Sequence, residues 1–353
     1  MTHRIVVVGA GYAGLTAAVR AAGQLRSAEA RVTLVNAAAG LVERVRLHQV
    51  AAGQRVPDLA LRDALRGTGV EFVLGRVRSV DPDGAEVWID EPDGPHVLGY
   101  DTLVYALGSM ADVQGVAGVS DHALTVAGFD DAKELSSRVS ALAAEGAILG
   151  VVGGGATGIE VATELAESYP SDVRDDAKVV EVHPDGVVLA DSDCVGVDAV
   201  LWTTGFRVPS LARDAGLSVD GHARVLVDDT LRSLSHPNVY AVGDAAVVRG
   251  PDGRELRMAC ATAIPAGRRA ADAIVSRLAG RGAAPLRFRY LVQCLSLGRR
   301  DGVIQFLHAD DSPRDGVLTG RAAALFKEAI VRGAAWTARR PGPLSEGTSR
   351  RRC

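Results

Sequence analysis

Two stretches of the chain share one pattern of apolar and small residues. Ile5–Val8 is an apolar, β-branched run that ends at Gly9, and a helical pattern of Leu and Ala follows it. Residues 148–152 form a second apolar run before Gly153, and a second helical pattern begins at Ile159. A run that is apolar at every position predicts a strand buried on both faces of a parallel sheet. We therefore predict two units, each made of a strand, a glycine turn and a helix.

The rest of the chain continues as strand and helix patterns separated by turn residues. Two predicted strands, at 102–108 and 197–203, are buried and lead into a glycine, and a basic amphipathic helix is predicted over 321–340. The other predicted elements are strands at 31–35, within 70–80, at 85–89, at 238–244, within 287–297 and at 303–307, and a helix at 264–278 with Pro265 in its first turn. This succession predicts an α/β fold.

The first glycine turn fits the pattern G-x-G-x-x-G through Gly9, Gly11 and Gly14. The first glycine permits a tight turn, the second lets the backbone approach a pyrophosphate, and the third lets helix and strand pack closely. The N-terminus of the following helix adds N–H groups and the positive end of its dipole. The pattern alone is a weak signal, but its place between a strand and a helix predicts a dinucleotide site.

The second glycine turn repeats this pattern through Gly153, Gly155 and Gly158. Two such turns are more specific than one, and they predict one dinucleotide-binding domain inserted in another. A ribose-binding acid is expected at the end of the strand after the first turn, and the chain has Asn36 there. An amide oxygen can still accept a hydrogen bond from a ribose hydroxyl, although it lacks the charge of a carboxylate.

Composition excludes several classes of partner and site. The formal net charge is -4 and aromatic residues make up 4% of the chain, so neither charge nor base stacking favours nucleic acid. No apolar run approaches the about 18 residues that span a bilayer, and no signal-peptide core precedes the first strand. The four cysteines are far apart, which predicts buried, reduced thiols in a cytoplasmic protein. Neither cysteine spacing nor an HExxH motif predicts a metal site.

The order of five motifs carries a family resemblance. They are the glycine turn at 9–14, Tyr-Ala-Leu-Gly at 105–108, Gly-Gly-Gly-Ala-Thr-Gly-Ile-Glu at 153–160, Thr-Thr-Gly-Phe at 203–206 and Val-Gly-Asp-Ala at 242–245. Over roughly residues 3 to 335, the chain resembles the FAD-dependent pyridine nucleotide oxidoreductases, which have two dinucleotide-binding domains. It looks most like type II NADH dehydrogenases and apoptosis-inducing-factor-like reductases. Because the chain has no CxxxxC motif, the disulfide reductase branch is excluded.

The resemblance implies an FAD-binding Rossmann-like domain, an inserted and truncated second Rossmann-like domain, and a C-terminal α+β segment. The FAD-binding domain would take residues 1–120 and 236–282, and the shortened NAD(P)H-type domain residues 121–235. Residues 283–338 would form a C-terminal interface segment. For 339–353 the composition predicts a disordered tail.

The resemblance also implies roles for individual residues. The pyrophosphate of FAD would lie on the first glycine turn, the adenosine ribose on Asn36, the adenine on the backbone of Val77 and the ribityl chain on Asp244. The helix after Met258 would point its N-terminus at the flavin, where negative charge gathers on reduction. The implied FAD-binding residues are Gly9, Gly11, Tyr12, Ala13, Gly14, Asn36, Arg44, Val77, Ala106, Gly108, Gly243, Asp244, Thr262 and Ile264, and the implied NAD(P)H-binding residues are Gly153, Gly155, Gly158, Glu160 and Gly205.

No side chain is assigned a catalytic role, because the flavin carries the chemistry of such proteins. Three residues are candidates: Glu160, which in similar proteins lies beside the nicotinamide, His48 and Cys260. Arg44, Arg46 and His48 occupy the place where the disulfide branch keeps its cysteines, so they could contact cofactor phosphate or a substrate. For Arg46, a solvated charged face is an equal alternative.

The second unit is shorter than the first. The interval from Gly158 to Gly205 is half as long as the interval from Gly14 to Gly108. About 30 residues, the size of one βαβ unit, are missing after the helix, and with them the strand that would read the ribose 2′-OH.

Two main interpretations of the shorter unit stay open. In the first, the protein takes hydride from NAD(P)H and passes electrons to a quinone or another small-molecule acceptor. In the second, it uses no NAD(P)H, and its substrate occupies the shortened lobe, as in a flavin-dependent oxidase or a biosynthetic tailoring enzyme. A binding protein that flavin merely stabilises is a minor third interpretation.

The predicted C-terminal helix has Leu325, Phe326, Ala329 and Ile330 on one side, with basic residues around it. We expect this side to cover the protein's own core or a second copy in a homodimer. Similar dehydrogenases dock on membranes through such helices, so peripheral membrane contact is the alternative.

Overall fold

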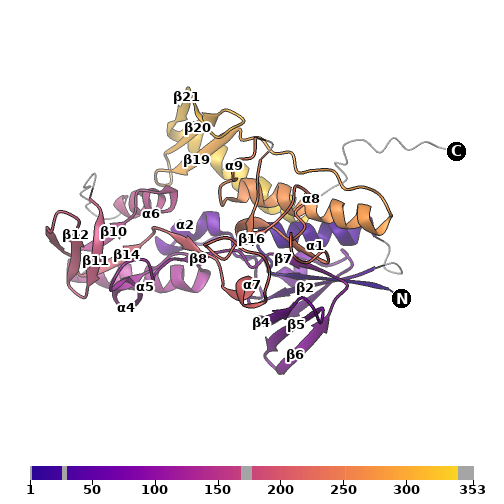
Figure 1. Ribbon diagram of the computed structural model, residues 1–353. Coiled ribbons are helices and arrows are strands. Elements are labelled where there is room, and N and C mark those ends of the chain that lie inside the picture. The colour runs from indigo at the N-terminus through magenta and orange to yellow at the C-terminus, as the bar shows by residue number, and fades with distance from the viewer. Residues whose placement is uncertain (1, 26–29, 168–176, 251, 341–353) are drawn as a thin grey trace.

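The computed structural model describes residues 2–25, 30–167, 177–250 and 252–340. The predicted disordered tail, apart from its first two residues, lies outside these ranges. Figure 1 shows two lobes, with the N-terminal strands and the helices α1 and α8 in one and the strands β10 to β14 in the other. A third sheet, β19 to β21, lies above the junction beside helix α9.

The first lobe is built on a parallel sheet in the order β17-β7-β1-β2-β3. Its strands are β1 His3–Val8, β2 Ala30–Asn36, β3 Val70–Leu74, β7 Thr102–Tyr105 and β17 Val239–Ala241. The helices α1 (Tyr12–Gln24) and α8 (Cys260–Leu278) pack against each other on this sheet. Residues of β17 and α8 thus return to the core that β1 and α1 begin, as the order of motifs predicts.

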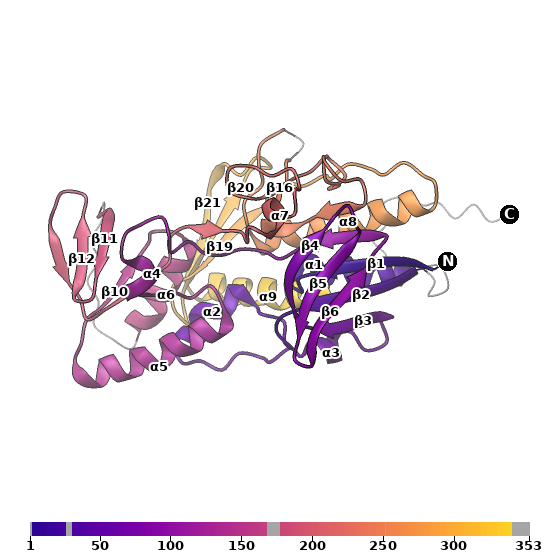
Figure 2. The same ribbon diagram turned by 60° about the horizontal axis from the view of Figure 1, so that its bottom comes forward.

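A small antiparallel sheet lies beside the parallel strands, as Figure 2 shows. It consists of β4 Arg76–Asp81, β5 Glu86–Glu91 and β6 Gly94–Gly99. The prediction of a single strand within 70–80 is therefore wrong, because the chain leaves the parallel sheet at Gly75 and begins β4. A Cβ at Gly75 would lie 2.4 Å from the side chain of Ile89, so the close approach of the two sheets requires glycine there.

The second lobe has a parallel sheet of three strands in the order β10-β14-β9. These are β10 Leu149–Val152, β14 Ala199–Trp202 and β9 Ala123–Leu124, with the helices α5 Phe129–Glu145 and α6 Ala156–Ala166. An antiparallel sheet, β11 Val179–His183, β12 Gly186–Leu189 and β13 Cys194–Gly196, follows α6 along the chain. Its first two strands, β11 and β12, form an antiparallel hairpin.

Short elements complete the two lobes and their junction. They are η1 Arg44–Arg46, α2 Leu47–Ala51, α3 Leu61–Ala64, β8 Met110–Ala111, α4 Val119–His122, β15 Phe206–Arg207, α7 Leu211–Asp214, β16 Val225–Leu226, η2 Gly243–Ala245 and β18 Ala246–Val247. Among them, β8 and β15 pair antiparallel. The outgoing and returning segments between the lobes therefore run side by side.

The C-terminal segment forms an antiparallel sheet and one long helix. Its elements are β19 Val292–Ser296, β20 Gly302–Leu307, β21 Pro313–Thr319 and α9 Gly320–Arg339. The hydrophobic pattern misses β21, because six of its seven residues are exposed and no alternation marks a buried face. Helix α9 spans the range predicted for it. No helix among the described residues is long and apolar enough to cross a bilayer.

Three helices begin earlier than the apolar pattern indicates. Gly11 and Gly155 are the N-caps of α1 and α6, so each helix starts within its glycine turn. The third, α8, begins at Cys260, which places Pro265 inside the helix and not in its first turn. The polar or small residues of a first turn carry no apolar periodicity, so the pattern reveals a helix only from its second turn onward.

Helix α9 has two apolar sides. The side with Ala323, Val331 and Ala335 is buried, and the helix contacts α1, α8 and the sheet β19 to β21 through it. Leu325 is 73% exposed and Phe326 is 45% exposed. The expectation that Leu325 and Phe326 cover the protein's own core is therefore wrong, because the alanine-rich side allows closer packing and takes that place.

Two thiols are only partly buried, and one is not buried at all. Cys260 and Cys294 are half-buried, whereas Cys194 in β13 is exposed. The prediction of buried thiols is therefore wrong for Cys194, which lies in a short strand at the edge of its sheet. Cys353 lies outside the described residues.

Candidate active site

A cavity of about 930 Å³ lies between the two lobes, and both glycine turns line it. From the first lobe it takes the turn at Gly11 and the ends of β7 and β17, and from the second lobe the turn at Gly153 and the end of β14. The carboxyl ends of parallel strands are the usual place for ligands in such sheets. The predicted residues that line the cavity are Gly11, Tyr12, Ala13, Arg44, Ala106, Gly108, Gly153, Gly155, Glu160, Gly205, Gly243, Asp244 and Cys260.

The first glycine turn leaves open space where a phosphate would lie. Gly9 has a φ of +97°, and a Cβ there would lie 2.2 Å from the backbone oxygen of Ala106. A Cβ at Gly14 would lie 1.9 Å from the backbone oxygen of Gly9. At Gly11, by contrast, a Cβ would meet no atom within 4 Å, and this position faces the cavity. Gly9 and Gly14 are therefore needed for the fold of the turn, whereas Gly11 leaves open space on the cavity side.

Asn36 lies at the end of β2 and binds the backbone of the first turn. Its Oδ1 accepts a hydrogen bond from the N–H of Ala10 at 2.9 Å, and its Nδ2 donates to the oxygen of Ala38 at 2.8 Å. The amide thus fixes the position of the turn, and the second lone pair of Oδ1 remains for a ribose hydroxyl. The backbone oxygen of Asn36 accepts from the N–H of Gly75 at 2.9 Å, so Val77 on β4 follows close to the same strand end, outside the cavity lining.

A carboxylate, a hydroxyl and a guanidinium meet on the cavity wall. Ser109 Oγ donates to Asp244 Oδ2 at 2.6 Å, and Arg44 Nη1 donates to Ser109 Oγ at 2.8 Å. Arg44 Nη1 also lies 3.5 Å from Asp244 Oδ2. The guanidinium carbon of Arg44 lies 5.3 Å from the ring centre of Phe206, which comes from the second lobe. Asp244 is therefore held through Oδ2 by Ser109 and Arg44, and its carboxylate lies on the cavity wall, where it could bind a polyol hydroxyl.

The second glycine turn has the same geometry as the first. Gly153 has a φ of +128°, and a Cβ there would lie 2.4 Å from Thr203 Oγ1. A Cβ at Gly158 would lie 1.9 Å from the backbone oxygen of Gly153, whereas a Cβ at Gly155 would meet nothing within 4 Å. The backbone of the second turn is therefore also shaped to receive a phosphate.

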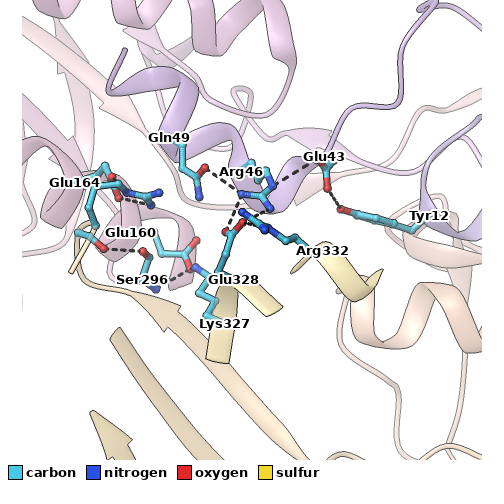
Figure 3. A network of polar contacts seen from close by, with 12 residues as sticks. Tyr12, Glu43, Arg46, Gln49, Glu160, Glu164, Ser296, Lys327, Glu328 and Arg332 are labelled. Atoms are coloured by element: carbon cyan, nitrogen blue, oxygen red, sulfur yellow. Dashed lines mark hydrogen bonds and ion pairs between the residues drawn. The ribbon is translucent and has the colours of Figure 1, made fainter. Parts of the chain in front are cut away.

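Glu160 is the centre of a buried polar cluster that joins three parts of the chain, part of which Figure 3 shows. Its Oε1 binds the ammonium of Lys327 on α9 and accepts from the N–H of Ser296 at 3.1 Å. Its Oε2 lies 3.4 Å from Nδ1 of His48 on α2. Burial raises the pKa of Glu160, and the charge of Lys327 opposes that rise. Glu160 and Lys327 both line the cavity, so this ion pair lies at its wall.

His48 lies behind Glu160 and does not line the cavity. Burial, together with Lys327, Arg299 and Arg46, lowers the pKa of its imidazole to about 3. Its Nε2 is buried and has no hydrogen-bond partner among the described residues. His48 is therefore neutral at physiological pH and reaches the cavity only through Glu160.

Arg46 is also withdrawn from the cavity. Its guanidinium makes two hydrogen bonds of 2.9 Å to the carboxylate of Glu328 on α9, and Gln49 lies beside it (Figure 3). Its side chain is almost fully buried, so the alternative of a solvated charged face is wrong. Arg46 instead holds α9 against the first lobe.

The N-terminus of α8 faces the cavity. Ala259, Cys260, Ala261 and Ala263 line it, whereas Thr262 and Ile264 do not. Thr262 Oγ1 donates within the same turn to backbone oxygens at 2.8 Å. Burial raises the pKa of the Cys260 thiol, so this residue lacks the lowered pKa that marks a reactive thiolate.

Sequence reasoning missed several side chains of this site. Ser109, Ser296 and Lys327 lie outside the five motifs, and Phe206 ends the fourth motif without an assigned role. Ser109 and Phe206 directly follow predicted strand-end glycines, which is a usable signal. Ser296 and Lys327 carry no such signal, because only the folding of the C-terminal segment onto the lobes brings them to Glu160.

The first lobe fits FAD on grounds of its own geometry. Gly11 leaves room for the pyrophosphate, the N-terminus of α1 supplies N–H groups, and Asp244 places a carboxylate on the cavity wall. The N-terminus of α8 adds a positive dipole end to the same cavity. These groups are the ones that a dinucleotide with a flavin and a ribityl chain requires.

Comparison with known proteins agrees with this geometry. Residues 3–185 and 167–267 match the pyridine nucleotide-disulphide oxidoreductase family. The chain belongs to this family. It is therefore an FAD-dependent oxidoreductase, as the order of its motifs predicts.

Among similar proteins, an NADH dehydrogenase-like protein of Mycobacterium tuberculosis is 27% identical over 93% of this chain and 92% of its own. A type II NADH:quinone oxidoreductase of Staphylococcus haemolyticus is 25% identical over 93% of this chain and 94% of its own. The solved structure of NDH2 from Plasmodium falciparum in complex with NADH has a TM-score of 0.80 at 14% identity and covers 96% of both chains. The fold predicted from the sequence, two Rossmann-like domains with a parallel core, is confirmed by these likenesses.

Proposed function

We propose that this chain transfers electrons from a reduced nicotinamide nucleotide, through FAD, to a quinone. One observation carries the proposal: a single cavity is lined by both phosphate-shaped glycine turns. A donor on the second turn and FAD on the first would then share one enclosed space. The names of the similar proteins from Mycobacterium tuberculosis and Staphylococcus haemolyticus support the same donor and acceptor.

The residues of the cavity have distinct tasks in such a transfer. FAD bound in the cavity would supply two-electron transfer between a hydride donor and an acceptor. The N–H groups of the first turn of α8 face the cavity and would stabilise negative charge on a flavin bound there. Lys327 Nζ and Glu160 Oε1 hold a proton at the cavity wall, where a quinone oxygen needs one on reduction.

The acceptor is expected on the side of the cavity that the C-terminal segment forms. Tyr290, Val292, Cys294 and Ile330 line this side, and Lys327 lies among them. A wall that combines apolar side chains with the ammonium of Lys327 suits a quinone, whose ring is apolar and whose oxygens accept hydrogen bonds.

We also propose that α9 reaches a lipid surface, from which an apolar quinone would enter. Leu325, Phe326 and Trp336 are exposed on its outer side, and Arg321 and Arg332 flank them. Apolar side chains with a basic border are typical of helices that lie in a membrane interface. A second copy of the chain is the other partner that this side could take.

Substitution tests this surface better than truncation, because α9 also packs on α1 and α8. A variant with Leu325→Ser, Phe326→Ser and Trp336→Ser should lose most of its co-sedimentation with anionic vesicles and keep its flavin. Sedimentation velocity of both proteins without vesicles shows whether each one is a monomer or a dimer. Equal vesicle binding by both would contradict the lipid surface, and a wild-type dimer that dissociates in the variant would assign this side to a second copy.

The proposed electron transfer is tested by mixing the FAD-loaded protein anaerobically with NADH or NADPH and following the flavin absorbance. We expect rapid loss of the oxidised band, and its return when a water-soluble ubiquinone analogue is added. The shortened second lobe favours one other function, a flavin-dependent oxidase or tailoring enzyme without NAD(P)H. Bleaching by dithionite but not by millimolar NADH or NADPH would overturn the proposal in favour of that enzyme.

A further inference from the structure

We propose that the second lobe binds the nicotinamide half of its electron donor and the phosphate attached to it, and makes no specific contact with the adenosine half. Reduced nicotinamide mononucleotide would then serve as electron donor about as well as NADH. This inference rests on the proposed function, because it concerns the donor of the same reaction. It goes further in stating which part of the donor the protein binds.

The first observation is that β10 is an edge strand. In the first lobe, β2 and β3 continue the sheet beyond β1, whereas no described strand pairs with β10 on the side away from β14. Only residues 167–178 separate the end of α6 from the start of β11. That length is too short for the strand, helix and strand of about 30 residues that would complete the sheet.

The second observation is how the first lobe uses the strand that the second lobe lacks. Asn36 ends β2, binds the N–H of Ala10 in the glycine turn and reaches the ribose position. A nucleotide-binding lobe reads the adenosine ribose from this strand end, and the adenine lies beyond it. In the described part of the second lobe, no strand end occupies the corresponding place beside Gly154. The adenosine half of a dinucleotide would therefore extend toward solvent.

The third observation is a cation that lines the cavity together with the second turn. Lys178 lines the cavity together with Gly153, Gly154 and Thr157. Its backbone oxygen accepts a hydrogen bond from the N–H of Ala190 at 2.8 Å, so the hairpin fixes where the side chain begins. The structure gives this exposed ammonium no carboxylate partner among the described residues. A lysine that lines the same cavity as a glycine turn and a helix N-terminus is suited to bind a phosphate there.

Together these features form a site for a nicotinamide ribose phosphate. The turn at Gly155, the N-terminus of α6 and Lys178 would hold the phosphate, and the nicotinamide would extend toward Gly205 and Glu160 on the same cavity wall. Contacts that are made by only one half of a donor contribute equally to binding whether or not the other half is present.

An anaerobic stopped-flow experiment on the FAD-loaded full chain compares four electron donors that contain different parts of the dinucleotide. They are NADH, NADPH, reduced nicotinamide mononucleotide and reduced nicotinamide riboside. We expect second-order reduction constants within about tenfold of one another for the first three, and a constant about tenfold lower for the riboside, which lacks the phosphate. Calorimetric titration with NAD⁺ and nicotinamide mononucleotide should likewise give dissociation constants within about tenfold.

The outcomes distinguish this inference from the proposed function. Reduction by NADH with a mononucleotide constant more than about tenfold lower would overturn the inference and leave the proposed function standing. If dithionite reduces the flavin but none of the four donors does, the proposed function fails, and the inference fails with it.

The variant Lys178→Gln tests the phosphate contact. It should lower the constants for NADH and for the mononucleotide by a similar factor, about three- to tenfold, and leave the riboside constant unchanged. Lys133→Gln is the matched control, because Lys133 lies on α5 beside Phe129 and outside the cavity lining. An equal loss for all three donors would mean that Lys178 supports the hairpin, and would overturn its assignment as a phosphate ligand.

Discussion

The glycine turn after β1 and the glycine turn after β10 make the same three contacts. In each, the first glycine has a positive φ and touches the neighbouring strand end, the third lies against the oxygen of the first, and the middle glycine faces open space. Their surroundings differ. Two further strands lie beyond β1, whereas β10 ends its sheet in the described part of the chain.

The helices that follow the two turns differ in the same way. Every residue of α1 from Tyr12 to Ala21 is buried, whereas α6 buries only Gly158, Val161, Glu164 and Leu165. At the position seven residues after the first glycine, α1 has the buried Thr16 against α8, and α6 has Glu160 with its charged partners. Apolar packing therefore joins α1 to α8, whereas α6 contacts α2 through apolar side chains and the C-terminal segment through charged groups.

This difference shows that two parts of a nucleotide site are separable. One is the phosphate cradle, meaning a glycine turn with the helix N-terminus after it, and the other is the site for the nucleoside. The cradle is made by six consecutive residues and a helix N-terminus, so it survives the loss of distant strands. Reading a ribose or an adenine requires neighbouring strand ends, which come from other parts of the sheet. A chain can therefore keep a phosphate cradle and lose the strand ends that bind the nucleoside.

The largest effect is expected from Gly11→Val. Its side chain would occupy the open space where the pyrophosphate lies, so FAD affinity should fall at least about a hundredfold, or about 2.7 kcal/mol. Fluorescence titration of the flavin-free protein with FAD measures this change. A variant that is purified fully yellow would contradict the assignment of the first turn.

The matched change in the second turn is Gly155→Val. Because Gly155 has the same open space but lies in the other lobe, the variant should keep FAD and lose at least about tenfold in the second-order constant for reduction by NADH. The measurement is stopped-flow reduction of the purified variant. Loss of flavin from this protein would show that the two turns do not act separately.

A smaller effect is expected from Asp244→Asn, which keeps the shape of the side chain and removes the charge beside Arg44. Hydrogen bonds to charged groups contribute about 1.5–3 kcal/mol, so FAD affinity should fall about tenfold or somewhat more. Ser109→Ala is the control that keeps the carboxylate, and it should weaken FAD less. Equal affinities for wild type and Asp244→Asn would exclude Asp244 from the site.

The smallest effect is a pH dependence that follows from the burial of His48 beside the charged cluster around Glu160. The pKa of His48 is lowered to about 3, so between pH 6.5 and 3 the unfolded chain binds a proton that the folded protein does not. Stability that is present above pH 6.5 is therefore lost as the pH falls. From pH 6.5 to 5.5, the wild type should lose about 1 kcal/mol of unfolding free energy more than His48→Gln.

Urea denaturation of the two FAD-loaded proteins at these pH values checks this difference. Parallel losses in the two proteins would mean that His48 is protonated in the fold. The charge cluster around Glu160 would then be weaker than its geometry indicates.

Much of the fold follows from the sequence, because its main signals are local. Buried strands such as Ile5–Val8 are apolar at every position, and the glycine turns are contiguous motifs. The strand β21 and the outer side of α9 were not predictable in this way. β21 is exposed on both faces, and which apolar side of α9 is buried depends on the shape of the surface that receives it.

By itself, the sequence determined the two phosphate cradles, their order along the chain and the shortening of the second lobe. Each of these depends on residues that are adjacent in the chain or on the distance between motifs. Only the tertiary structure decided which side chains complete the site. Ser109 meets Asp244, and Glu160 meets Lys327, across more than a hundred residues. Such contacts form only in the folded chain, because no local sequence pattern indicates which distant segments will lie against each other.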